Sequence, residues 1–186
     1  LYDTVVRPSY TASTSNDIQR SNFLPFNEVE GKVTVDTTLS TGVPAAKLND
    51  PVDLWFGMMV EFEFYMPENG QVNGSDMIFD FHGDDDVYVY IDDVLVLDIG
   101  GTHAAESGTI NFATGETSDL TGTSTLKTLF TNALGSDNVD ADDFSDNTFA
   151  NYTKHKLKFF YMERGGNISY CRLRFNMPTL PDNSLM

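Results

Sequence analysis

Three consecutive aspartates, Asp84, Asp85 and Asp86, stand directly before a run of alternating apolar and polar residues. Adjacent carboxylates repel one another, so either water solvates all three or a bound cation neutralises part of their charge. Oxygen ligands favour a hard ion, and calcium accepts carboxylates, carbonyls and water together. From the residues alone, a calcium site and a solvated acidic turn both remain open.

The residues after the aspartates predict a β-hairpin. Apolar and polar residues alternate over 87–91, and the pattern continues over 95–97 after the turn residues Asp92 and Asp93. This is typical of two half-buried strands joined by a tight turn. The hairpin would hold the aspartates at the start of its first strand.

The same period of two recurs along most of the chain. It runs through 58–66, 77–82 and 156–161, and through 168–175, where Cys171 falls on the apolar face. Half-buried antiparallel strands have this pattern, and several of them at short spacing predict an antiparallel β-sandwich. A single cysteine excludes an internal disulfide, and its strand position favours a small buried residue over a reactive thiol.

One segment departs from this period. Apolar residues recur at helical spacing over 125–134, with Ser124 placed to cap the helix and Gly135 to end it. The flanks are rich in Gly, Ser, Thr, Asn and Asp, so we interpret 113–150 as an insertion that either sets specificity or is decorative. The aspartates of this segment are interpreted either as a second calcium site or as a solvated acidic loop. An EF-hand is excluded, because Phe144 occupies a position that needs an oxygen ligand.

Composition limits the partners. The 186 residues suit one domain, and the net charge of −17 argues against nucleic acid and anionic membrane surfaces. No apolar run is long enough to span a bilayer and no signal peptide opens the chain, so we expect no membrane insertion. Because the sequence starts without Met, we expect it to be excised from a longer protein.

Several short motifs resemble a known family. Residues 83–91, GDDDVYVYI, followed by 98–103, DIGGTH, and 161–164, YMER, are similar to the fibro-slime domain, a branch of the PA-fourteen (protective-antigen-type) β-sandwich superfamily. Residues 21–26, SNFLPF, resemble the family's Asn-Phe-Phe-Pro opening. The resemblance runs from Asn22 to Phe175, with a divergent stretch within 113–150, and implies a single domain over residues 1–176.

The resemblance also implies a calcium site. In sugar-binding yeast flocculins of the superfamily, two adjacent aspartates joined by a cis peptide bind calcium, which contacts sugar hydroxyls, and Asp84 and Asp85 fall on those positions. The flocculins complete the site from a loop after the penultimate strand. Here Glu163 follows that strand, so we expect it as the third side-chain ligand, with an ion pair to Arg164 or a neighbouring arginine as the alternative.

The expected ligand-binding residues are Asp84, Asp85, His103 and Asn167. His103 follows two glycines in a loop that the hairpin should direct to the same end of the sandwich, where it would hydrogen-bond a sugar or serve a structural role. Aromatic rings such as Tyr88, Tyr90 or Tyr170 would offer apolar faces to a glycan.

We therefore expect a calcium-dependent carbohydrate-binding or adhesion module, extracellular and at the cell surface. Residues 177–186 resemble the linker to collagen-adhesin B-type stalk repeats, which implies a monomeric module in a longer, wall-anchored Gram-positive adhesin. Its partner would be a glycan or glycoprotein of a host or neighbouring cell, or a plant polysaccharide.

Two other functions remain open. The first is a structural surface domain whose calcium stiffens a loop. The second is a glycan-active enzyme, because a glycosidase needs only two suitably placed carboxylates and the chain has 28 acidic residues. The sequence lacks the metalloprotease, serine-hydrolase and phosphate-loop motifs, so we expect no enzyme.

Overall fold

The computed structural model describes residues 55–165 and 169–177, together with the backbone of four short N-terminal strands. Those strands pair antiparallel in the order β1-β2-β4-β3. They are β1 (Tyr10–Ala12), β2 (Asp17–Arg20), β3 (Val33–Asp36) and β4 (Ala45–Leu48).

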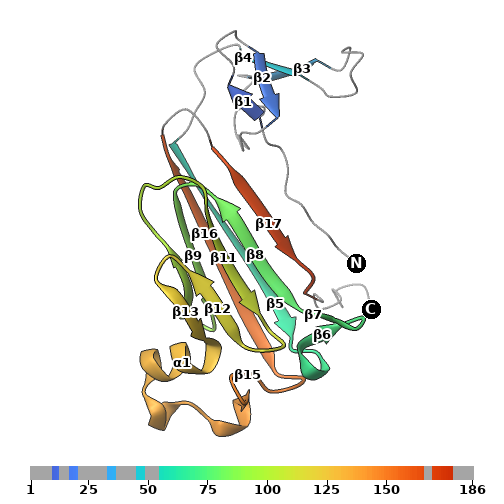
Figure 1. Cartoon of the computed structure of the whole chain (residues 1–186), viewed down its shortest axis with the longest axis vertical. Coiled ribbons are helices and arrows are strands. Elements are labelled where there is room, and N and C mark those ends of the chain that lie inside the picture. The colour runs from blue at the N-terminus through green and yellow to red at the C-terminus, as the bar shows by residue number, and fades with distance from the viewer. Residues whose placement is uncertain are drawn as a thin grey trace, which may run out of the picture.

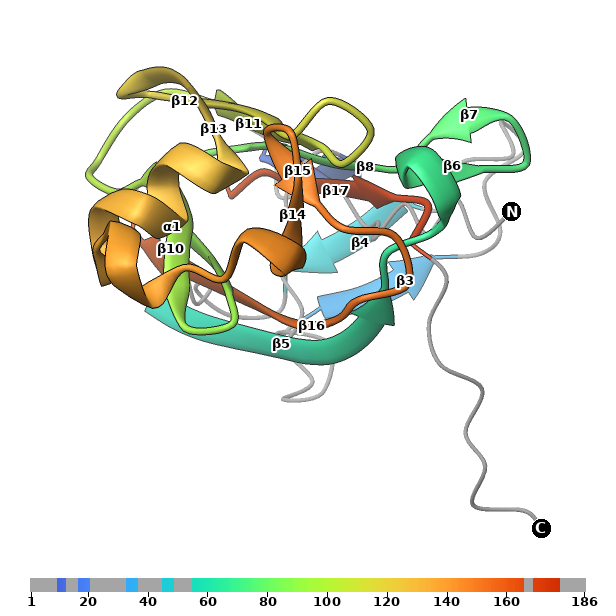
Figure 2. The ribbon, with the colours of Figure 1, turned by 90° about the horizontal axis from the view of Figure 1, so that it is seen from below.

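Two larger antiparallel sheets form the layers of a sandwich (Figures 1 and 2). The first has the order β10-β9-β16-β5 and the second the order β13-β12-β11-β8-β17. The first contains β5 (Trp55–Tyr65), β9 (Asp86–Ile91), β10 (Val94–Ile99) and β16 (Lys154–Arg164). The second contains β8 (Ile78–Gly83), β11 (Glu106–Asn111), β12 (Glu116–Asp119), β13 (Gly122–Thr125) and β17 (Cys171–Phe175). The predicted all-β, antiparallel sandwich class is confirmed.

The core lies between the sheets, where alternate residues of each strand point inward. Phe79 and Phe81 of β8 pack on Phe159 of β16 in the opposite layer, with ring centroids 6.1 and 5.9 Å apart. Each large apolar side chain buried in this way stabilises the fold by about 1.5–3 kcal/mol. Cys171 is buried as expected, and burial, with a smaller contribution from Asp84, raises the pKa of its thiol to about 12.

The predicted hairpin is formed by β9 and β10. Asp92 and Asp93 have positive φ angles of 47° and 66°, the conformation that a two-residue turn requires and that aspartate tolerates. The Asp92 carboxylate accepts hydrogen bonds from His155 Nδ1 (2.6 Å) and Lys156 N (2.8 Å), which joins the turn to β16. The hairpin therefore has a fixed position relative to the strand that carries Glu163.

A small hairpin lies between β5 and β8. A 3-10 turn, η1 (Glu68–Gly70), leads into β6 (Gln71–Val72), which pairs with β7 (Ser75–Asp76). Asn73 and Gly74 form the turn between them, both with positive φ.

The predicted helix is α1 (Leu126–Leu134), and Gly135 ends it as expected. Its N-cap is Thr125 and not Ser124, because the helix begins at Leu126 and Thr125 Oγ1 accepts a hydrogen bond from Thr128 N. The rest of the segment contains η2 (Ser136–Asn138), η3 (Ala141–Asp143), β14 (Phe144–Ser145) and β15 (Thr148–Phe149).

Segment 113–150 is built into the fold. Strands β12 and β13 extend the second sheet, and α1 contacts β10 at one end of the sandwich (Figure 2). Leu126, Phe130, Phe144 and Phe149 are buried in the same core as the sheets. Part of this segment therefore stabilises the domain, whatever its exposed loops bind.

Candidate metal centre

Asp84 and Asp85 form the turn between β8 and β9, and Asp86 begins β9, at the end of the sandwich opposite α1 (Figure 1). The peptide bond between Asp84 and Asp85 is trans, unlike that of the flocculins, since residues 55–165 and 169–177 contain no cis peptide. Instead, Asp85 adopts a left-handed conformation with φ 58°, which a short polar side chain tolerates. The chain reverses through this residue.

Asp84 and Asp85 connect the turn to two other strands. Asp84 Oδ1 accepts a hydrogen bond from Tyr170 N (2.5 Å), and Asp84 N donates to Tyr170 O (3.0 Å), just before β17. Asp85 Oδ2 accepts from Arg164 N (2.7 Å) at the end of β16. Each bond uses one oxygen, and a carboxylate has acceptor sites for further ligands.

Glu163 lies against these two aspartates. It is 2% exposed and points into the sandwich beside Tyr161, whose hydroxyl donates to Glu163 Oε2 (3.1 Å). Burial raises the pKa of Glu163 to about 8; a hydrogen bond from Ser169 opposes this, and the neighbouring Asp85 and Asp84 carboxyl groups raise it further. The structure thus brings together the predicted metal ligands Asp84, Asp85 and Glu163.

The alternative ion pair between Glu163 and Arg164 is not formed. Adjacent residues of β16 point to opposite faces, and Arg164 pairs with Asp86, with Nε 2.5 Å from Oδ2. Among the residues that the structure describes, no ion pair reaches Asp84, Asp85 or Glu163. Glu163 Oε1 is buried there without a hydrogen-bond partner.

Asp86 has a positioning role that the sequence did not reveal. It is buried, and Oδ1 accepts hydrogen bonds from Gly101 N (2.6 Å) and Arg164 Nη2 (3.1 Å). It therefore fixes the 100–103 loop and the end of β16. The only sequence signal for it was its place as the third aspartate before the strand.

Burial raises the pKa of Asp84, and His103 lies near enough to Asp84 to oppose this slightly. His103 Nδ1 is 2.8 Å from Ala104 O and its Nε2 3.2 Å from Ile99 O. These contacts favour the structural role, and hydrogen bonding to a sugar stays a prediction. Asn167 lies outside the described residues.

The donor set suits a hard cation. It consists of the carboxyl oxygens of Asp84, Asp85 and Glu163, and Glu163, whose buried Oε1 has no hydrogen-bond donor, is largely protonated at neutral pH. Within 55–165 and 169–177, however, no three His, Cys, Asp or Glu side chains are already arranged around a common metal position. Calcium binding would therefore require Glu163 to lose its proton and the carboxylates to adjust.

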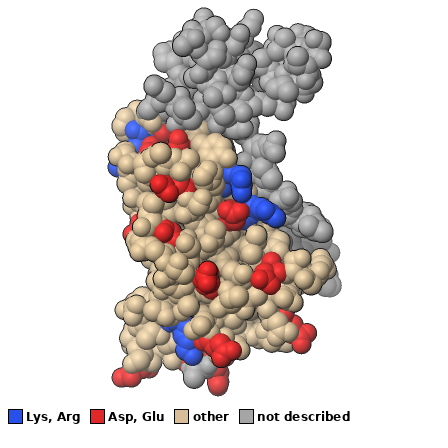
Figure 3. Space-filling model, viewed as in Figure 1, with Lys and Arg blue, Asp and Glu red and all other residues tan. Residues whose placement is uncertain are grey.

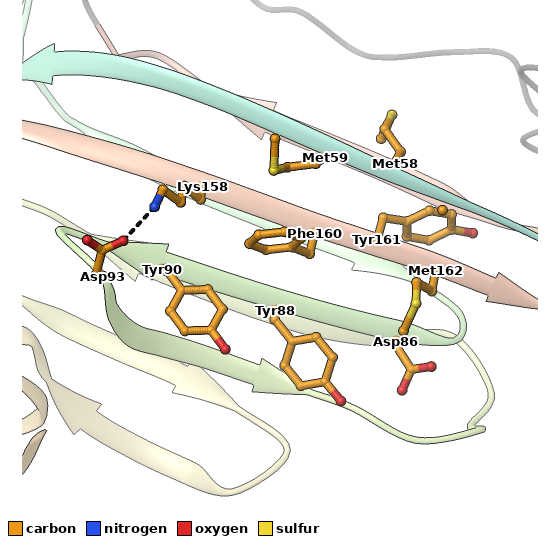
Figure 4. A pocket seen from close by; sticks show the side chains of 11 residues that line it. Met58, Met59, Asp86, Tyr88, Tyr90, Asp93, Lys158, Phe160, Tyr161 and Met162 are labelled. Atoms are coloured by element: carbon orange, nitrogen blue, oxygen red, sulfur yellow. Dashed lines mark hydrogen bonds and ion pairs between the residues drawn. The ribbon is translucent and has the colours of Figure 1, made fainter.

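A second feature adjoins this centre on the outer face of the first sheet. Tyr88, Tyr90 and Phe160 line a groove of about 600 Å³, together with Met59 and Met162 (Figure 4). Asp86 lies at one end of the groove and the Asp93–Lys158 pair at the other. Tyr170, the third aromatic candidate, instead packs edge-on against His82.

Comparison with known proteins adds short matches only. The chain is 61% identical to Protein psiF of Dictyostelium discoideum over 36 residues, which are 19% of this chain and 5% of psiF. It is 64% identical to Protein psiD of the same organism over 33 residues, 18% of this chain and 6% of psiD. No family model and no solved structure matches the chain. Among the described residues no helix is long and apolar enough to cross a membrane.

Proposed function

We propose that this domain is a calcium-dependent carbohydrate-binding or adhesion module. The observation that carries the proposal is the Glu163 carboxyl group, which is buried beside Asp84 and Asp85 with one oxygen unpartnered. Buried carboxyl groups cost free energy unless they are neutralised. In the absence of metal a proton serves this purpose at Glu163, and a divalent cation would replace it.

The three side chains would hold the ion in defined ways. One carboxylate oxygen of Asp84 and one of Asp85 accept backbone hydrogen bonds from Tyr170 and Arg164, and these side chains would have to adjust to bring their other oxygens to a common metal position. Glu163 is oriented by Tyr161. When bound, calcium supplies further coordination positions, because it takes six to eight oxygens, and vicinal sugar hydroxyls are suitable ligands.

The proposed setting is extracellular, where calcium modules commonly bind the ion with dissociation constants of about 10⁻⁴–10⁻³ M. The acidic surface suits neutral glycans better than polyanions, and Figure 3 shows acidic side chains over much of one face. The similar proteins are amoebal, so they do not support the Gram-positive, wall-anchored part of the expectation.

A structural calcium site is the competing function. It is favoured by the bonds from Asp84 and Asp85 to backbone amides, which join three strand ends whether or not a sugar binds. Hydrolysis is less well supported. Glu163, the one carboxyl group described here that burial clearly holds protonated at neutral pH, is 2% exposed, whereas a general acid must reach the glycosidic oxygen.

Calcium titration by calorimetry tests the metal centre. The informative variant is Glu163→Gln, because glutamine resembles the protonated acid that already fills this position without metal. We expect Glu163→Gln and Asp85→Asn to fold normally and to lose calcium binding. Glu68→Gln, a matched change at an exposed site, should bind like the wild type.

A glycan array with calcium or chelator then separates the two functions. Chelator-sensitive glycan binding that Glu163→Gln abolishes supports the binding module. Calcium binding without any glycan binding supports the structural domain. If Glu163→Gln binds calcium as tightly as the wild type, the proposed metal centre is wrong.

A further inference from the structure

Part of the outer face of the first sheet is unusually apolar for a surface that faces water. In a sandwich the outward residues are normally polar. Here Tyr88, Phe160 and Met59 form one row across β9, β16 and β5, because Phe160 is paired with both of the others. Tyr90 packs edge-on against Phe160, with ring centroids 5.8 Å apart (Figure 4).

The groove carries little net charge although the protein is strongly acidic. Its carboxylates are paired, Asp86 with Arg164 at one end and Asp93 with Lys158 (2.5 Å) at the other. Within a chain of net charge −17, this local balance favours an uncharged ligand. The paired groups still offer hydrogen-bonding atoms at both ends.

The groove adjoins the candidate metal centre along the chain, through Asp86. Asp86, which lines the groove, directly follows Asp85 and fixes the loop through Gly101 N. The same loop packs on the groove aromatics, since a Cβ atom at Gly100 would lie on the Tyr88 hydroxyl. Tyr88 is therefore the groove ring that contacts the loop held by Asp86.

We propose that the groove binds the successive rings of a neutral oligosaccharide whose terminal sugar is held at the calcium. A pyranose ring has an apolar face that packs on aromatic side chains and hydroxyls at its rim that hydrogen-bond. The volume of about 600 Å³ lies in the range of small-molecule sites, whereas protein interfaces are larger and flatter. This inference rests on the proposed function and adds a chain-length preference to it.

The test uses manno-, cello- and malto-oligosaccharides, from monosaccharide to hexasaccharide, titrated with calcium present. The groove variants are Tyr90→Ala/Phe160→Ala, which removes two rings, and Met59→Glu, which places a charge at a side chain that is 58% exposed. The control is Tyr65→Ala, an exposed aromatic on the same face of β5 but outside the groove. Thermal melts establish that each variant folds.

We expect the wild type and the control to bind longer chains about tenfold more tightly than monosaccharides, and the groove variants to lose this gain while still binding monosaccharides. Equal affinity for all lengths, or unchanged binding in both groove variants, overturns the inference and leaves the calcium site standing. If no sugar of any length binds, both proposals fail.

Two further outcomes are informative. Oligosaccharide binding that needs the groove but not calcium supports the groove and contradicts the metal-dependent function. An apolar face can also bind a second copy of the chain, and sedimentation velocity tests for such a dimer. A dimer that forms in the wild type and dissociates in the groove variants would show that a second copy covers the groove, and would overturn the inference.

Discussion

The hydroxyl group of Tyr161 donates a hydrogen bond to Glu163 Oε2 over 3.1 Å, inside the sandwich. The two residues are two apart on β16 and therefore point to the same face. Burial raises the pKa of Tyr161, so its hydroxyl stays protonated and can only orient the carboxyl group. One core strand thus both packs the sandwich and directs an acid toward Asp84 and Asp85.

Calcium should raise the stability of the domain. At roughly a hundred times the dissociation constant, a ligand that binds only the folded state adds about 2.7 kcal/mol to the free energy of unfolding. Thermal melts in calcium and in chelator at equal ionic strength measure this. Glu163→Gln should show no difference between the two conditions, and a wild type that shows none contradicts a bound ion.

Calcium affinity should rise with pH up to about 8. The pKa of Glu163 is raised from 4.5 to about 8 without metal, so below pH 8 calcium must displace a proton. Affinity should then increase by up to about tenfold per pH unit until Glu163 is ionised. Calorimetry in buffers of different ionisation enthalpy measures the released proton. A pH-independent affinity between pH 6 and 8 would contradict Glu163 as a ligand.

Without calcium, the same group should make the protein less stable as pH rises. Between the unfolded pKa of 4.5 and the folded value of about 8, the folded state holds a proton that the unfolded state has lost. The free energy of unfolding therefore falls over this range and levels off above it. Urea unfolding in chelator at several pH values should show a shallower fall for Glu163→Gln than for the wild type.

Asp86→Ala should destabilise the domain by about 1–3 kcal/mol, because it removes a buried partner from Arg164 and from Gly101 N. The control is Asp93→Asn, which removes the charge from an exposed pair with Lys158 while asparagine tolerates the positive φ at this position, so it should cost far less. Chemical denaturation compares them. Equal costs would show that Asp86 does not fix the loop.

Phe130→Ala in α1 should cost about 3–5 kcal/mol, since Phe130 is only 6% exposed and packs on Phe144 and Phe149. Leu134→Ala in the same helix, at a side chain that is 45% exposed, should cost far less. Denaturant unfolding measures both costs as changes in the free energy of unfolding. A small cost for Phe130→Ala would indicate that 113–150 is a removable insertion.

The sequence determined several of the long strands with their inward faces, and the helix. The alternation over 77–82 and 156–161 fixes which side chains are buried, because a strand has a period of two and one face must meet the core. The helical spacing after Thr125 likewise fixed α1. These are local properties, so they are readable without the fold.

Only the tertiary structure decided which distant residues meet. Glu163 is 79 positions from Asp84, and their proximity depends on β16 pairing with β9 and on the Tyr170 bond that holds Asp84. Arg164 forms its ion pair with Asp86 and not with Glu163, because neighbouring residues of a strand point to opposite faces. The groove arose in the same way, since strand register alone placed Tyr88 of β9, Phe160 of β16 and Met59 of β5 in one row.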